Sequence, residues 1–207
     1  NDMQKLLSLP ESLVPVFHEL TGYDQDWFVT SDPAGQRVGS GGGTAWLLES
    51  HRKQGGTSFS EYLRSSVKIM IHAGGQGRRL PAYAPSGKVI APVPVFRWGR
   101  GQKLDQTLLD LQVPLYERIM EVACDSQHLL IASGDTLIMA PEIPDRLPDA
   151  DVVCFGIWVE PHHASRHGVF FTPRDNPNRL EFMLQKPDHE NIERLSGSHL
   201  YLMDIGI

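Results

Sequence analysis

The chain has 207 residues, of which 41% are hydrophobic and 21% are charged, and its formal net charge at pH 7 is −6. This length and composition exclude a disordered chain and allow one large domain with a buried core. The negative balance provides no overall attraction for nucleic acid or anionic lipid. We therefore expect neither as a partner, and any phosphate site has to be local.

Cysteine usage and hydropathy favour a cytoplasmic protein. The only cysteines, Cys124 and Cys154, each lie beside apolar residues, which is typical of small buried side chains in a reducing compartment. No apolar run reaches the roughly 20 residues that a membrane span needs, and the first residues show no signal pattern. We therefore expect a cytoplasmic protein that does not enter a membrane.

The first 66 residues are predicted to form an N-terminal extension. The pattern over residues 3–20 predicts an amphipathic helical start, which Pro10 and Pro15 interrupt. A loop with the glycine-rich run 39–43 is expected to follow. Composition alone favours a flexible linker for that run.

Residues 67–207 are predicted to form an α/β core. A β-branched apolar run over 67–73 predicts the first strong strand, and apolar residues at helical spacing predict a helix over 104–122, which Pro114 kinks or breaks. Further strands are expected over 128–133, 151–159, 168–172, 180–185 and 200–207. Strands that alternate with helices predict an α/β sheet.

A basic glycine loop follows the strand predicted over 67–73. No Asp or Glu occurs from residue 74 to residue 103, but this segment holds Arg78, Arg79, Lys88, Arg97, Arg100 and Lys103. Glycines after a buried strand let backbone N–H groups converge on a phosphate, whose charge the cations then neutralise. A tight turn with solvated arginines is the alternative, and it is the better interpretation for glycines alone. A dinucleotide-binding loop would need a third glycine where Leu80 stands, and the GxxxxGK[ST] phosphate loop is absent.

The spacing in this loop resembles the signature of sugar nucleotidyltransferases, Gly74-Gly75-x-Gly77-x-Arg79-Leu80, with Lys88 nine residues after the arginine. Three later segments resemble that family's Gly-Asp, Tyr-Gly-Val and Glu-Lys-Pro motifs in the same order: Ser133-Gly134-Asp135, His167-Gly168-Val169 and Gln185-Lys186-Pro187. More narrowly, residues 39–44 and 72–88 look like the guanylyltransferase half of bacterial bifunctional L-fucokinase/L-fucose-1-phosphate guanylyltransferases. This resemblance covers nearly all of the chain.

The resemblance implies a Rossmann-like nucleotidyltransferase domain over 1–207, an α/β fold with a mixed, mostly parallel sheet flanked by helices. It implies transfer of a guanylyl group from GTP to L-fucose-1-phosphate, giving GDP-L-fucose and pyrophosphate by in-line attack on the α-phosphate. It also implies a covalently linked kinase domain in the full-length chain. Because the motifs do not fix the base, another sugar-1-phosphate nucleotidyltransferase stays open, and so does a non-catalytic nucleotide-sugar-binding module.

Particular residues receive roles from the same resemblance. The catalytic cations are implied to be Arg79, Lys88 and Lys186. The nucleotide is implied to bind Gly74, Gly75, Gly77, Arg78, Gly41 and Gly42, and the sugar substrate to bind Gly168, Gln185 and Asp204. The cofactor is implied to be Mg²⁺, with Asp135 as its ligand.

Simpler interpretations exist for some of these residues. An isolated Gly-Asp after a strand is more often a turn, and Lys186 equally suits an exposed lysine at a strand end. Gln185 also stands where the family has glutamate, and Asp204 stands where it has asparagine. The second metal carboxylate of such enzymes would lie beyond Ile207, so we expect the core to be truncated there and activity to need a longer chain.

Overall fold

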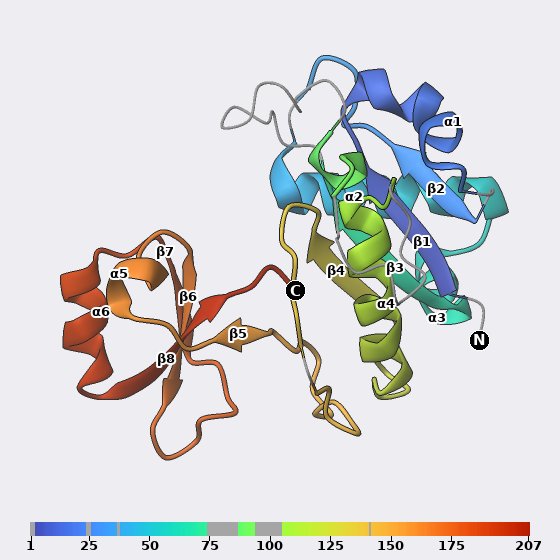
Figure 1. Cartoon of the computed structure of the whole chain (residues 1–207). Coiled ribbons are helices and arrows are strands. Elements are labelled where there is room, and N and C mark those ends of the chain that lie inside the picture. Colours follow the sequence, from blue (N-terminus) through green and yellow to red (C-terminus); the bar gives the residue numbers. More distant parts are fainter. Residues whose placement is uncertain (1–2, 24–25, 37, 74–86, 94–104, 141) are drawn as a thin grey trace. The chain divides into compact units, whose positions relative to one another are not determined.

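The computed structural model describes residues 3–23, 26–36, 38–73, 87–93, 105–140 and 142–207 (Figure 1). The chain divides into two compact units, Asn1–Asp151 and Val152–Ile207. Across the described ranges, no helix combines the length and the apolar character needed to cross a membrane.

The first unit is built on a four-stranded parallel sheet. Its strands are β1 (Met3–Ser8), β2 (Trp27–Thr30), β3 (Val67–His72) and β4 (Leu129–Ser133), in the order β2-β1-β3-β4. All three strand pairings are parallel. The carboxyl ends of the four strands therefore meet at one edge, which is where open α/β sheets bind ligands.

The helical start expected over residues 3–20 is wrong in its first part. Residues 3–8 form a strand that pairs with β2 on one side and β3 on the other, and Leu6 and Leu7 are fully buried. A strand covered on both faces carries consecutive apolar residues instead of alternating ones, so its pattern is easily mistaken for a helix. Helical structure begins only after Pro10, with η1 (Glu11–Val16) and α1 (Phe17–Thr21).

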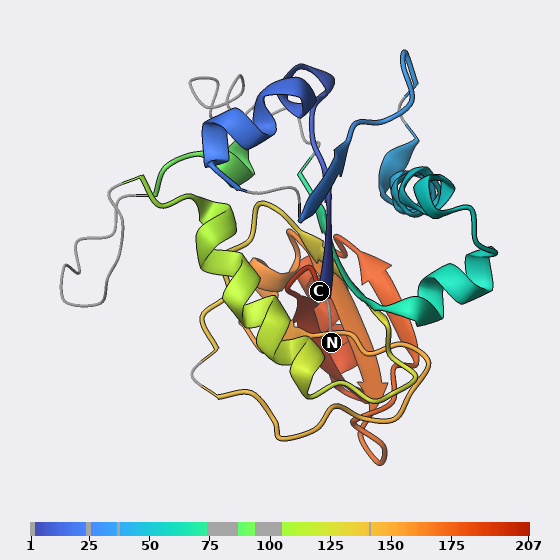
Figure 2. The same cartoon turned by 90° about the vertical axis from the view of Figure 1, so that its right-hand side faces the viewer.

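Helices cover both faces of this sheet. Figure 2 shows α2 (Gly39–Gly55) and α3 (Phe59–Ser65) on one side of β1 and α4 (Leu108–Glu121) on the other. The glycine-rich run 39–43 is therefore the first turn of α2 and not a linker or loop. The expected helix over 104–122 is confirmed as α4, with Pro114 inside it. A capping box between Thr107 and Asp110 fixes the start of α4, because each residue's side chain accepts a hydrogen bond from the other's backbone N–H.

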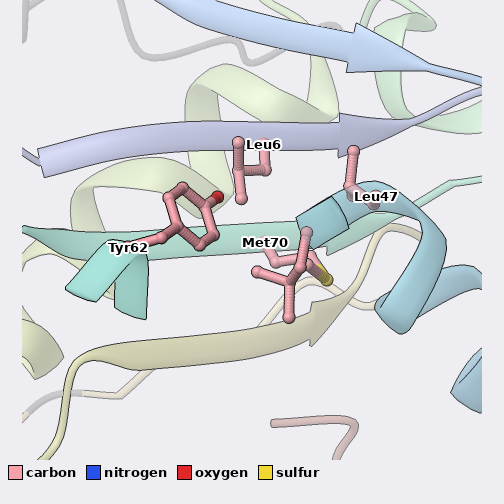
Figure 3. Packing of buried hydrophobic residues seen from close by; sticks show 5 residues of the cluster. Leu6, Leu47, Tyr62 and Met70 are labelled. Carbon is pink, nitrogen blue, oxygen red and sulfur yellow. The ribbon is translucent and has the colours of Figure 1, made fainter. Parts of the chain in front are cut away.

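One part of the core joins the sheet to α2 and α3. Leu6 and Met70 stand opposite each other on β1 and β3, and they pack with Leu47, Leu48 and Tyr62 (Figure 3). Leu47 and Leu48 come from α2, so their burial holds that helix on the sheet. The apolar area that these side chains remove from water stabilises the helix despite its weak glycine-rich start.

Truncating Leu6 to alanine is expected to lower the free energy of unfolding by about 2–5 kcal/mol, because a fully buried side chain leaves a cavity. Urea unfolding of the two proteins measures the difference. Leu20→Ala is the control, since Leu20 is 58% exposed, and it should change stability by about 0.5 kcal/mol or less. Equal effects of the two changes would contradict the position of Leu6 in the core.

The second unit holds an antiparallel sheet. Its strands are β5 (Gly156–Ile157), β6 (Gly168–Pro173), β7 (Phe182–Gln185) and β8 (His199–Asp204), in the order β5-β8-β6-β7. The helices α5 (Pro161–Ala164) and α6 (His189–Ser196) belong to the same unit. Side chains from these helices and strands form its core: Ala164, Val169, Phe171, Ile192 and Tyr201.

The strand expected over 151–159 differs most from the prediction, because the structure has a strand over only two of these residues. Only Gly156 and Ile157 pair with β8. Val152 is 77% exposed, so the apolar run before them is not a buried strand. The sheet of the first unit is mostly what the sequence predicted, a parallel α/β sheet flanked by helices.

Candidate active site

The structure brings together two residues that the sequence singled out, Lys88 and Asp135. Lys88 begins the short helix η3 (Lys88–Ile90), and Asp135 lies two residues beyond the end of β4. Lys88 Nζ donates to Asp135 Oδ2 at 3.2 Å, and Ser133 Oγ donates to Asp135 Oδ1 at 2.7 Å. Both oxygens of the carboxylate therefore have a donor, at the carboxyl edge of the parallel sheet.

This pair is accessible to a ligand. The side chains of Lys88 and Asp135 are 33% and 55% exposed. An ion pair this exposed contributes little to stability, about 0–1 kcal/mol. The pair therefore places a cation and an anion side by side where a ligand can reach them.

The environment keeps Asp135 ionised. The hydrogen bond from Ser133 has the largest effect and lowers the pKa of Asp135; burial raises this pKa, and Lys88 lowers it further, so the net shift is downward. Since the pKa is lower in the folded protein, the resulting stabilisation is present above the unfolded pKa of about 3.9. It is lost as the pH falls through the folded pKa.

Ser133→Ala is expected to raise the pKa of Asp135 toward its ordinary value, because it removes the largest cause of the shift. A pH titration by NMR, with the aspartate carboxyl carbons labelled, measures the change. The pH at which the carboxylate loses its charge should move up in the variant. An unmoved titration would show that the Ser133 hydroxyl does not hold the carboxylate.

Gly134 is required by the close approach of β3 and β4. Its N–H donates to the carbonyl oxygen of His72 at 2.8 Å. A Cβ on Gly134 would lie 2.9 Å from that same oxygen and from the Cβ of Ala73, which is too close for a side chain. The glycine therefore lets the turn that carries Asp135 lie against the end of β3.

Gln112 of α4 is a residue of this site that the sequence analysis missed. It is 2% exposed. Its Nε2 donates to the backbone oxygens of Ser133 at 3.3 Å and Thr136 at 2.5 Å, on either side of Asp135. One sequence signal could have identified it: Gln112 falls, at helical spacing, on the same buried face of α4 as Leu109, Val113 and Tyr116.

The three candidate sugar-binding residues lie together in the second unit. Gly168 stands opposite Gln185 in the register of β6 and β7. A Cβ on Gly168 would lie 3.2 Å from Gln185 Oε1 and 3.3 Å from Asp204 Cβ. Carboxamide and carboxylate groups at one end of this sheet can hydrogen-bond hydroxyl groups.

Lys186 follows β7 in a backbone conformation that is uncommon for a residue with a side chain. Its φ is +51°, and its N–H donates to the carbonyl oxygen of His167 at 2.9 Å. The left-handed region costs a residue with a Cβ about 1–2 kcal/mol, and such residues concentrate at functional sites. The Lys186 side chain is exposed.

The remaining candidates are two glycines in α2 and five residues of the basic loop. Gly41 and Gly42 lie in the first turn of α2, at the same carboxyl edge as the end of β3. Five candidates of the basic loop lie outside the described residues, and their roles stay predictions: Gly74, Gly75, Gly77, Arg78 and Arg79.

The described part of this site offers one carboxylate, that of Asp135, as a ligand for a metal ion. No group of three or more His, Cys, Asp or Glu side chains that could hold a metal occurs within the described ranges. Mg²⁺, however, is commonly bound by one or two carboxylates together with water and substrate phosphates. Asp135 fits this mode of binding, since its hard oxygen donors are accessible.

The chain thus has an α/β unit with a lysine and a carboxylate at the carboxyl edge of a parallel sheet flanked by helices, where open α/β sheets bind ligands. Comparison with known families gives a narrower result. The model of the fucose pyrophosphorylase domain matches residues 60–203. The chain belongs to this family, which confirms the resemblance seen in its motifs.

The names of three individual relatives agree with this family. The chain is 57% identical to the L-fucokinase/L-fucose-1-P guanylyltransferase of Bacteroides fragilis over 99% of its own length and 22% of the relative's. It is 26% identical to the bifunctional fucokinase/GDP-fucose pyrophosphorylase of Arabidopsis thaliana, over 85% of the chain and 19% of the relative. The fucose-1-phosphate guanylyltransferase of Mus musculus is 27% identical over 84% of the chain and 29% of the relative.

The chain thus spans between 19% and 29% of the length of these three relatives. No solved structure matches it significantly.

Proposed function

We propose that the chain is the guanylyl-transferring part of a fucose-1-phosphate guanylyltransferase, which converts GTP and L-fucose-1-phosphate to GDP-L-fucose and pyrophosphate. The observation that carries this proposal is the 57% identity, across 99% of the chain, to a relative with that activity in its name. The Lys88–Asp135 pair supports it, because it supplies charges of both signs where the parallel strands end. The fucokinase part of two relatives' names supports a covalently linked kinase domain in the full-length protein.

The reaction requires charge compensation more than proton transfer. An oxygen of the sugar phosphate attacks the α-phosphorus of GTP, the bond from that phosphorus to the bridging oxygen breaks, and pyrophosphate leaves with the electron pair. The attacking phosphate is already ionised, so no general base is needed. Lys88, together with Arg79 of the basic loop, would neutralise the charge that grows on the departing pyrophosphate.

Asp135 would hold Mg²⁺ in this proposal. When bound, the ion supplies charge neutralisation at the phosphates. The Lys88 ammonium group, 3.2 Å from Asp135 Oδ2, balances the charge of the carboxylate. The Ser133 hydroxyl at 2.7 Å holds the other carboxylate oxygen in a fixed direction.

The second unit would bind the sugar phosphate. Gln185 and Asp204 offer hydrogen-bond acceptors, and the Gln185 amide also offers donors, for the fucose hydroxyl groups. The missing side chain at Gly168 keeps both close, since a Cβ there would contact each of them. Lys186 would hold the sugar phosphate through its exposed ammonium group.

Turnover assays with the full-length protein and Mg²⁺ test the proposal. GTP, ATP, UTP and CTP are each paired with fucose-1-phosphate and with other sugar-1-phosphates, and pyrophosphate release is measured. We expect GTP with fucose-1-phosphate to give the highest kcat/KM. A clear preference for UTP would defeat the fucose assignment, and binding of GDP-fucose without any pyrophosphate release would instead identify a non-catalytic module.

A further inference from the structure

A second group of polar side chains lies at the carboxyl edge of the first unit's sheet, on the other side of β3 from Asp135. Asp32 follows β2 by two residues, and His72 is the last residue of β3. The position that a Cβ would take on Gly43, in α2, lies 3.5 Å from Asp32 Oδ1 and 3.9 Å from His72 Nδ1. Both side chains therefore converge beside the first turns of α2.

We assign the tautomer of His72 from the hydrogen bonds of Thr44. Thr44 Oγ1 donates to the carbonyl oxygen of Ser40 at 2.9 Å and lies 2.8 Å from His72 Nε2. When the single proton of the Thr44 hydroxyl group is donated to Ser40, His72 Nε2 is the donor toward Thr44. Burial lowers the pKa of His72, which favours the neutral ring despite an opposing effect of Asp32. In that neutral ring, Nδ1 is an acceptor.

The result is a pair of hydrogen-bond acceptors, the Asp32 carboxylate and His72 Nδ1. Within the parts of the chain that the structure describes, neither has a donor. A metal ion is a poor occupant, since no third His, Cys, Asp or Glu joins them there. The occupant that fits has to present two adjacent donors.

Among nucleobases, guanine presents such donors along one edge, its N1–H and its exocyclic N2 amine. Adenine offers an acceptor, N1, beside its N6 amine, and cytosine likewise places N3 beside N4. Uracil offers a single N–H between two carbonyl oxygens. We propose that Asp32 and His72 recognise the N1–H and N2–H edge of guanine, an inference that rests on the proposed use of GTP by this site.

The position of the pair agrees with a nucleotide that extends along this edge. The His72 carbonyl accepts from the N–H of Gly134, the residue before Asp135. The end of β3, which carries the proposed base site, therefore lies beside the turn after β4 that carries the proposed phosphate site. The base would lie toward β2 and the phosphates toward β4.

The test compares kcat/KM for GTP, ITP and ATP in the full-length protein and in Asp32→Asn. ITP keeps N1–H but lacks the N2 amine, so we expect the wild type to use it about 10- to 100-fold less well than GTP, the loss of one hydrogen bond to a charged acceptor. Asparagine has the same size as aspartate and adds a donor that can face adenine N1. We expect the GTP-to-ATP ratio to fall at least about 10-fold, mainly through KM. His72→Leu should lower the same ratio.

Asp145→Asn is the matched control, because Asp145 is an exposed aspartate of the same unit, and it should leave the ratio unchanged. An Asp32→Asn variant that loses activity equally with GTP and ATP would give Asp32 a structural role and overturn the proposal. Equilibrium binding of GDP and ADP to the same proteins separates this from the proposed function. If the wild type does not turn over GTP, that function fails, whereas a preference for GDP that Asp32→Asn abolishes would still uphold the base assignment.

Discussion

Asp135→Asn is expected to lower the kcat of the full-length protein about 100-fold or more, because it removes the negative charge that the proposed cation at the phosphates requires. Asparagine keeps the size of the side chain and an oxygen that can accept from Ser133. The free energy of unfolding should therefore change little, as expected for a side chain that is 55% exposed. Pyrophosphate release at saturating GTP and fucose-1-phosphate, followed against Mg²⁺ concentration, measures the effect.

The control for this change is again Asp145→Asn, which alters an exposed aspartate without known partners in the described structure and should leave kcat unchanged. A loss of activity that higher Mg²⁺ concentration partly restores would support a role in metal binding. Full activity of Asp135→Asn at every Mg²⁺ concentration would remove Asp135 from the mechanism.

Lys88→Met is expected to lower kcat about 100- to 1000-fold, a loss typical of removing one group that stabilises transition-state charge. Methionine keeps most of the aliphatic stem and removes the ammonium group that lies 3.2 Å from Asp135. Lys88→Arg should restore only part of the rate, because a planar guanidinium cannot place its charge as a compact ammonium does. Rapid-quench measurement of a single turnover isolates the chemical step.

Lys53→Met serves as the control for the loss of one lysine. Lys53 is 65% exposed and its nearest carboxylate, Glu49, lies 3.8 Å away. Its replacement should leave kcat unchanged. If Lys88→Met raised only KM, with an unchanged single-turnover rate, Lys88 would bind the substrate without stabilising the departing pyrophosphate.

The sequence predicted those elements whose signal is local. The strand over 67–73 and the helix over 104–122 were found because β-branched runs and helical periodicity are properties of neighbouring residues. β1 was missed because its identity depends on partners far along the chain: Leu6 pairs with Phe28 and with Met70. Such partners are invisible to a pattern confined to one segment.

In the glycine-rich run 39–43, tertiary structure produces a helix that local composition does not predict. Glycine is among the weakest helix formers, so composition argued for a flexible segment. Burial of Leu47 and Leu48 one to two turns later holds α2 on the sheet and extends the helix back through the glycines. Burial of this kind overrides local propensity.

The candidate site was predictable in part. Lys88 and Asp135 are 47 residues apart, and only their motifs indicated that they belong together; the structure shows their side chains in contact. Gln112 and Asp32 carry no motif, and their importance follows from what they face in three dimensions. Gly168, Gln185 and Asp204 come from three separate segments that the resemblance assigned to the sugar, and the structure brings them together at one end of the second unit's sheet.

The place of β1 also bears on how the protein tolerates shortening. β2 joins the sheet only through β1, and β1 in turn is the neighbour of β3. A protein that lacks residues 1–8 would have no β1. Strand β2 would then have no hydrogen-bonding partner, and the face on which α2 rests would be uncovered. Asp32 and Thr44 would then lose their support, so trimming the first eight residues would damage the base-binding end of the site from a distance.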